Sequence, residues 1–344
     1  KVKNGFSSFD TWEKDERRRD TLSDEKIAAL QDECDFWRFL QFEFFRELTA
    51  LKDYAKSKNV ALIGDIPIYV AYDSADVWAH PEIFRLDKNM RPKEVAGVPP
   101  DYFSADGQLW GNPLYDWKKQ QADGFLWWHN RLLHQLQFFD KIRIDHFRAF
   151  ESYYAVPSGA KTAKIGRWVK GVGTKIFDGL DIDGRIIAED LGIITDKVRR
   201  LVKRTGFPGM KVFQFAFDGK SDNEHLPENV RYNTVYYTGT HDNDTLKGWY
   251  DAQGDGTKEY VKKTLGATDE NVFDKAFKKV MRSRAKFVIV PMQDYLLQGS
   301  EARMNTPGTN DGNWKYVLPK NYAKVKNRIR KYVRNRCGDS RAKN

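Results

Sequence analysis

The chain has 344 residues, of which 40% are hydrophobic and 14% aromatic, and its formal net charge at pH 7 is +10. A chain of this length can bury a large core, and the lack of any run of about 18 apolar residues predicts no membrane-spanning helix. The only two cysteines, Cys34 and Cys337, belong to no metal-ligand or redox motif, so neither zinc nor a structural disulfide is expected.

Short apolar runs alternate with longer amphipathic patterns along the chain. The short runs predict six strands, at residues 60–70, 141–147, 185–191, 211–217, 234–240 and 287–293. The amphipathic patterns predict helices at residues 31–57, 123–138, 163–178, 195–205, 257–286 (interrupted near Thr268) and 320–335. Strands that alternate with helices form parallel sheets, so the pattern predicts an α/β fold.

One long segment, 71–122, separates the first predicted strand from the next helix and is rich in Pro, Gly, Trp and Tyr. Connections of this length in compact domains usually serve function. We therefore expect residues 71–122 to be an inserted loop region that contributes to the active site.

The positive charge is densest at Arg17-Arg18-Arg19 and between Lys320 and Lys343. A basic chain is compatible with a nucleic-acid ligand, but no base-reading or stacking motif accompanies these residues. We interpret both stretches as solvated faces and expect no nucleic-acid partner.

Three acidic motifs follow predicted strands: RIDHFR at 143–148, AEDLG at 188–192 and THDN at 240–243. A single carboxylate at the end of a buried strand is often an ion pair or a helix N-cap. Three in succession favour an active site, because α/β barrels place their catalytic residues at the carboxyl ends of the strands.

Glycoside cleavage with retention needs two carboxyl groups about 5–5.5 Å apart, one as nucleophile and one as acid. A nearby cation keeps a nucleophile ionised. Arg143 lies two residues before Asp145, so both side chains point to the same face of a strand. Glu189, with its longer side chain, suits the acid, whose pKa must be raised by burial or by a neighbouring carboxylate.

Four further strings accompany these motifs: LIGDIPIYV at 62–70, DSADVW at 73–78, GVPPDYFS at 97–104 and GQLWGNP at 107–113. On these residues, from about Phe36 to Trp314, the chain resembles the amylomaltases, or disproportionating enzymes. These are the 4-α-glucanotransferases of glycoside hydrolase family 77 in the α-amylase clan. All of the strings in this order make the resemblance specific.

The resemblance implies transfer of α-1,4-glucan segments between maltodextrin, amylose or glycogen chains by a retaining double displacement. Asp145 would be the nucleophile, Glu189 the general acid/base and Asp242 the third acid, which binds sugar hydroxyls. The implied substrate-binding residues are Arg143, His241, Tyr102, Phe103, Trp110, Asn112, Asp101, Tyr69 and Asn313. Tyr102 and Phe103 would lie on a mobile loop that excludes water, and Trp110 would stack on a sugar. Core packing is the alternative for these aromatic residues.

The fold implied by the resemblance is a (β/α)₈ TIM barrel with inserted helical and loop subdomains. Residues 1–344 would form a single catalytic domain containing strands three to eight of the barrel. The first two strands would then lie before residue 1. The sequence begins without an initiator Met or a signal region, so we expect it to start inside a longer protein.

Two other functions stay open at this point. A retaining α-glucan hydrolase of the same clan differs only in the final acceptor, and a truncated, non-catalytic fragment would bind glucan without turnover. No cofactor or metal is expected, because the carboxylates have a use without one. A cytoplasmic location is expected, with a plastid as the alternative, and the sequence does not indicate an oligomeric state.

Overall fold

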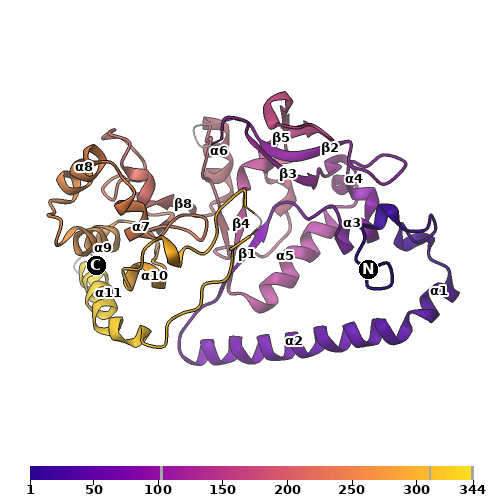
Figure 1. Ribbon diagram of the computed structural model, residues 1–344, viewed down its shortest axis with the longest axis horizontal. Helices are drawn as coiled ribbons and strands as arrows, with labels where there is room; N and C mark the ends of the chain where they lie inside the picture. The colour runs from indigo at the N-terminus through magenta and orange to yellow at the C-terminus, as the bar shows by residue number, and fades with distance from the viewer. Residues whose placement is uncertain (101–103, 310, 342–344) are drawn as a thin grey trace. The chain divides into compact units, whose positions relative to one another are not determined.

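The computed structural model describes residues 1–100, 104–309 and 311–341. The chain divides into two compact units, Lys1–Phe207 and Pro208–Asn344 (Figure 1). A single catalytic domain over the whole chain stays a prediction. No helix in the described part of the chain is both long and apolar enough to cross a membrane.

Three parallel strands form one sheet of the first unit, in the order β1 (Ile63–Pro67), β4 (Lys141–Asp145) and β7 (Ile186–Ala188). They confirm the first three predicted strands. The register pairs Asp65 of β1 with Arg143 of β4, so these two polar residues become neighbours near the carboxyl end of the sheet.

The helices of the first unit are α1 (Asp24–Ala29), α2 (Gln31–Ser57), α3 (Ala75–Ala79), α4 (Trp117–Ala122), α5 (Leu126–Phe138) and α6 (Asp196–Thr205). The longer ones, α2, α5 and α6, confirm three predicted helices. In α5, Trp128, Leu132 and Leu136 recur every four residues, so they share the face that is buried in the core.

Four antiparallel strands, which the sequence pattern did not predict, form a second sheet in this unit. Their order is β3 (Gln108–Pro113), β2 (Glu94–Val98), β5 (Ser152–Pro157) and β6 (Arg167–Lys170). The segment 71–122 contributes β2 and β3 to this sheet. It therefore contains regular elements, α3, β2, β3 and α4, where the sequence pattern predicted a loop.

The predicted helix at 163–178 is wrong. Its centre is β6, where Trp168 and Val169 pair with β5, and short 3₁₀ turns lie on either side. At Gly171 a Cβ would lie 2.3 Å from the carbonyl oxygen of Phe150, so only glycine permits this path of the chain. The spacing of apolar residues within 163–178 cannot reveal constraints that come from β5 and Phe150, which lie outside this segment.

The sheet of the second unit is also parallel, in the order β10 (Phe287–Ile289), β9 (Thr234–Tyr237) and β8 (Gly209–Val212). It confirms the strands predicted at 234–240 and 287–293 and the start of the one predicted at 211–217, of which Phe213–Ala216 form a 3₁₀ helix instead. Because both units contain parallel strands connected by helices, the predicted α/β class is confirmed.

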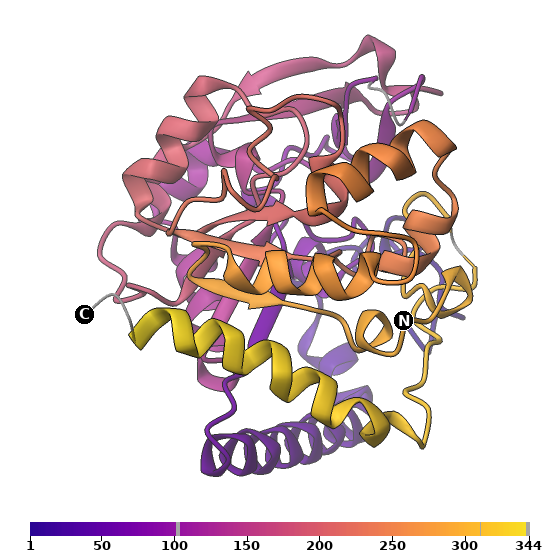
Figure 2. The ribbon, with the colours of Figure 1, turned by 90° about the vertical axis from the view of Figure 1, so that its left-hand side faces the viewer.

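The helices of the second unit are α7 (Leu246–Asp251), α8 (Asp255–Leu265), α9 (Val272–Arg282), α10 (Met292–Tyr295) and α11 (Lys326–Arg341). The break predicted near Thr268 is confirmed, because left-handed Gly266 ends α8. The helix predicted at 320–335 is confirmed as α11. Helices α9 and α11 lie side by side, with the rings of Phe277 and Tyr332 5.2 Å apart (Figure 2).

The long helix α2 packs only lightly on its own unit. Phe45 stacks on Phe138 of α5, with ring centroids 4.6 Å apart. Most other large side chains of α2 are exposed: Phe36, Trp37, Phe39, Leu40, Phe42, Phe44, Leu51 and Tyr54. Such a surface is typical of a helix that packs against a further element.

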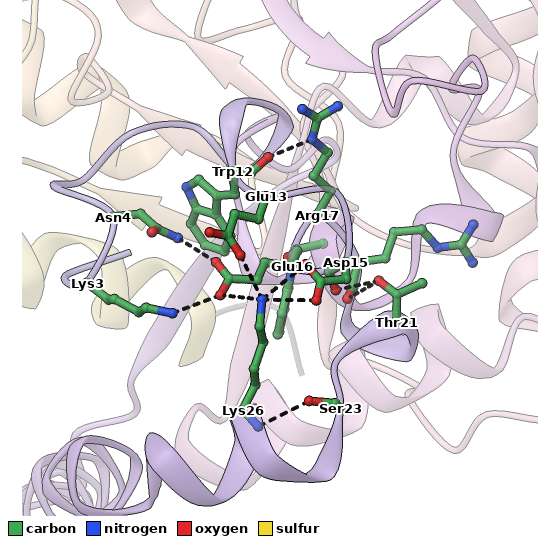
Figure 3. A network of polar contacts seen from close by, with 12 residues as sticks. Lys3, Asn4, Trp12, Glu13, Asp15, Glu16, Arg17, Thr21, Ser23 and Lys26 are labelled. Atoms are coloured by element: carbon green, nitrogen blue, oxygen red, sulfur yellow. Dashed lines mark hydrogen bonds and ion pairs between the residues drawn. The ribbon is translucent and has the colours of Figure 1, made fainter.

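The N-terminal segment is held by a polar network around the buried carboxylate of Glu16 (Figure 3). Lys3 donates to Glu16 at 2.8 Å, and the ammonium group of Lys26 lies 3.1 Å from the same carboxylate. The indole N–H of Trp78 donates to the Glu16 carbonyl at 2.8 Å, which connects the segment to α3. Lys3, then Lys26 and Asn4, lower the pKa of Glu16 to about 2 against the opposing effect of burial.

This network predicts an acid-sensitive N-terminal segment. Because the folded pKa of Glu16 lies below its ordinary value of 4.5, the stabilisation is present above pH 4.5 and is lost as the pH falls toward 2. Hydrogen exchange of residues 1–26, corrected for intrinsic rates, should therefore increase over that range. Glu16→Gln should make exchange fast already at pH 6, whereas exposed Glu25→Gln should behave as wild type. Equal protection in Glu16→Gln and wild type would contradict this account.

Candidate active site

Arg143 holds two carboxylates at the carboxyl end of the first parallel sheet. Its side chain is buried, and it donates to Asp65 of β1 and, at 2.7 Å, to Asp145 Oδ1. Burial lowers the pKa of Arg143, but Asp145 and Asp65 outweigh it and raise that pKa overall. Asp145 is 43% exposed. Asp145 is thus an ionised carboxylate that Arg143 holds in place and that is accessible to solvent.

Glu189, which follows β7, is the second carboxylate of this site, and it is buried. Its Oε2 accepts from the backbone N–H of His146 at 2.7 Å, and its Oε1 accepts from that of Leu191 at 2.8 Å. Burial, followed by the charge of Asp145, raises the pKa of Glu189 to about 7, although Arg143 opposes the rise. Two carboxyl groups with such different environments can divide the nucleophile and acid roles.

His146 connects the two acids. It follows Asp145 directly and has φ of +53°, a left-handed conformation that directs its N–H to Glu189. Burial, then Arg148, lowers the pKa of His146 to about 3, so its ring is neutral. The ring is nearly perpendicular to that of Trp110, with centroids 4.8 Å apart. Its Nε2 is buried without a hydrogen-bond partner among the described residues.

Aromatic side chains line the same region. Trp110 on β3 is 36% exposed, and its ring lies 6.5 Å from that of Tyr69, which follows β1. Tyr69 is buried and stacks on Tyr115, so its position is fixed and it packs against Trp110 on the buried side. Asn112 donates to the carbonyl of Val70 at 2.8 Å and holds β3 against this segment. Asp101, Tyr102 and Phe103, predicted to bind substrate, lie outside the described residues.

Asp242 lies in the second unit, in the loop after β9. Its Oδ1 accepts from Asn305 Nδ2 at 2.7 Å, and its carbonyl accepts from Arg303 at 2.7 Å. His241 Nε2 is 3.4 Å from Asp242 Oδ2, and its ring packs on Trp314 at 5.1 Å. Two residues of the segment after β10 therefore help to hold Asp242 in place.

A pocket of about 160 Å³ in the second unit adjoins this loop. Its lining residues are Thr240, His241, Asn243, Asp244, Thr245, Pro291, Gln293, Asp294, Ala302, Arg303, Met304 and Trp314. Asn313 is not among them. Its Oδ1 accepts from the Thr306 N–H and its Nδ2 donates to the Thr309 carbonyl, both at 2.9 Å, so its amide connects to the backbone of these two residues.

The structure brings Arg143, Asp145, Glu189, Tyr69, Trp110 and Asn112 together in the first unit, and places His241, Asp242 and Asn313 in the second. Sequence reasoning did not assign roles to His146, Arg303 or Asn305. The signal for His146 was its position next to Asp145, and Arg303 and Asn305 lie in the stretch 298–305, which resembles a second active-site loop of the amylomaltases. No group of three or more His, Cys, Asp or Glu residues in the described ranges could hold a metal ion.

Comparison with known proteins places this geometry in a family. The family model described as 4-alpha-glucanotransferase matches residues 1–321. The chain belongs to the 4-alpha-glucanotransferase family. It is 46% identical to the 4-alpha-glucanotransferase of Clostridium butyricum over 323 residues, covering 92% of this chain and 66% of the relative. It is 44% identical to the 4-alpha-glucanotransferase of Aquifex aeolicus over 328 residues, covering 94% of this chain and 67% of that relative.

A solved structure agrees with this family assignment. The amylomaltase from Streptococcus agalactiae in complex with acarbose has a TM-score of 0.91 and 34% sequence identity, and the match covers 96% of this chain and 69% of that one. The chain thus spans about two thirds of the length of these three proteins.

The coupling of the two acids in the first unit can be measured directly. Asp145→Asn should lower the pKa of Glu189 below about 7, because it removes the negative charge that raises it. The pKa should not fall as far as 4.5, because burial, the larger cause, remains. Carboxyl ¹³C NMR of labelled protein would report the titration. Exposed Asp251→Asn should have no effect, and a Glu189 pKa that is equal in Asp145→Asn and wild type would refute the coupling.

Proposed function

We propose that this protein transfers α-1,4-glucan segments from a donor maltodextrin to the 4-hydroxyl of an acceptor glucan or glucose. The observation that carries the proposal is the pair of acids at the sheet edge. Asp145 is kept ionised by Arg143, and Glu189 has a pKa raised to about 7. Membership of the 4-alpha-glucanotransferase family and the likeness to an acarbose-bound amylomaltase support it.

The reaction consists of two displacements at C1 of a glucose unit. In the first, an Asp145 oxygen forms a bond to C1 as the bond between C1 and O4 of the leaving glucan breaks. The leaving O4 takes the proton of Glu189. In the second, the ionised Glu189 removes the proton of an acceptor 4-hydroxyl, which attacks C1 and releases Asp145. The two inversions retain the α configuration.

Arg143 contributes to both steps because it stabilises Asp145 as an anion before attack and after release. Glu189 must gain and lose a proton within each cycle, and a pKa near 7 makes both transfers accessible at neutral pH. Asp242, oriented by Asn305, binds sugar hydroxyls and favours the distorted ring of the transition state. His241 and Asn313 belong to the substrate site in this proposal.

Transfer rather than hydrolysis requires that an acceptor sugar be held while water is excluded. The exposed ring of Trp110 offers an apolar face on which a sugar can stack. We assign Asp101, Tyr102 and Phe103 to the acceptor side, with the two aromatic residues as a lid. The six parallel strands would be strands three to eight of a (β/α)₈ barrel in one catalytic domain. A cytoplasmic location, or a plastid one, belongs to the same proposal.

Incubation with pure maltotriose tests the proposed activity. We expect glucose and a ladder of longer oligosaccharides, resolved by chain length. Asp145→Asn should reduce their formation by about three orders of magnitude or more, because no covalent intermediate can form. Asp251→Asn, an exposed substitution outside the site, should match wild type.

Two other outcomes would overturn the proposal. Glucose and maltose without longer products would mean that water is the acceptor and the protein is a retaining hydrolase. Binding of amylose without any products would identify a glucan-binding protein that lacks turnover.

A further inference from the structure

Asp294 is a buried carboxylate that the proposed reaction does not use. It lies on α10, directly after β10, and is 1% exposed. Its Oδ2 accepts from the hydroxyl of Thr238 at 2.5 Å, and its Oδ1 accepts from the backbone N–H of Leu246 at 2.7 Å. No cation in the described part of the chain forms an ion pair with it.

The two partners of Asp294 are the two ends of one loop. Thr238 directly follows β9, and Leu246 is the first residue of α7. The intervening loop, residues 239–245, carries His241 and Asp242. A single carboxylate therefore binds both ends of the loop that presents the third acid.

Other contacts attach the same loop to the segment after β10. Ser300 donates to Asp244 at 2.6 Å, and Thr245 donates to the carbonyl of Gln298 at 2.8 Å. Gln214, which follows β8, donates to the carbonyl of Asp244 at 2.8 Å and so attaches the loop to a further segment. A displacement of the loop ends must therefore move the residues between them.

A buried anion with only neutral partners contributes little to stability, so its presence calls for another reason. Burial raises the pKa of Asp294 to about 6, with the nearby charge of Asp244 adding to the rise. The hydrogen bonds from Thr238 and Leu246 oppose it. At neutral pH the group is mainly ionised, the form in which both oxygens accept strong hydrogen bonds.

We infer that Asp294 is a positioning residue: it holds the ends of loop 239–245 so that Asp242 is directed at the reacting sugar. This role rests on the proposed function, because Asp242 matters only where a sugar is bound. Its effect should appear in kcat more than in KM, since the third acid acts on the distorted ring of the transition state.

Kinetics of single and double variants test this inference. Asp294→Ala should lower kcat about tenfold or more and change KM less than about threefold, because it releases both loop ends. Asp294→Asn keeps the size of the side chain and one of its acceptor oxygens, so its kcat should be close to that of wild type and higher than that of Asp294→Ala. Thr238→Val, which releases one end, should be intermediate.

A double-mutant cycle separates positioning from general damage. If Asp294 acts through Asp242, its removal from an Asp242→Asn protein should cost less than about twofold, because the group being positioned is already lost. Losses that multiply in the double variant would overturn the inference.

Asp274→Ala is the matched control. Asp274 is a partly buried carboxylate of α9 that accepts from Tyr332 of α11 at 2.8 Å. Its loss should lower the melting temperature and leave kcat within about twofold of wild type. An equal loss of kcat in Asp274→Ala and Asp294→Ala would mean that Asp294 matters only for stability.

Hydrogen exchange tests whether Asp294 holds the ends of loop 239–245, even if the protein shows no turnover. Asp294→Ala should accelerate exchange in residues 238–246, whereas Asp274→Ala should do so in α9 and α11. Unchanged exchange in residues 238–246 of Asp294→Ala would overturn the inference. Absence of transfer by wild type, with accelerated exchange in the variant, would overturn the proposed function and leave the loop attachment intact.

Discussion

The buried guanidinium of Arg143 is the constraint on which the first part of the site depends. A charge in this position is stabilised by Asp65 and Asp145, which both bind it. The parallel register of β1 and β4 puts Asp65 beside Arg143, and the alternation of side chains along β4 puts Asp145 on the same face. The charge of Asp145 then helps to raise the pKa of Glu189. One ion triad thus gives the two carboxyl groups different electrostatic environments, which suits the different roles that we propose for them.

In the second unit, Asp242 has different partners from those of Asp145. Asp242 is held by an amide, Asn305, and by the hydrogen bonds that attach its loop to the segment after β10. Arg143 favours the ionised form of Asp145. The amide of Asn305 fixes the direction of the Asp242 carboxylate.

Strand positions were predictable because parallel strands are short apolar runs bounded by polar residues. All six were found, and the three acidic motifs lie at or after the ends of β4, β7 and β9 as expected. The antiparallel sheet was missed, since its strands are stabilised by partners far away in sequence. Local apolar spacing predicts a helix over Trp168 and Val169, because it does not reveal that these residues pair with β5.

The sequence by itself determined the α/β class, the positions of the three acids and the family resemblance, because these depend on local patterns and on residue identity. Only the tertiary structure decided which groups act on each acid. The contacts of Glu189 with two backbone amides, of Asp242 with Asn305, and of Asp294 with both ends of a loop join residues that are distant in the chain or belong to the backbone. Burial and hydrogen bonding control the pKa and direction of a carboxylate, and both exist only once these segments have come together.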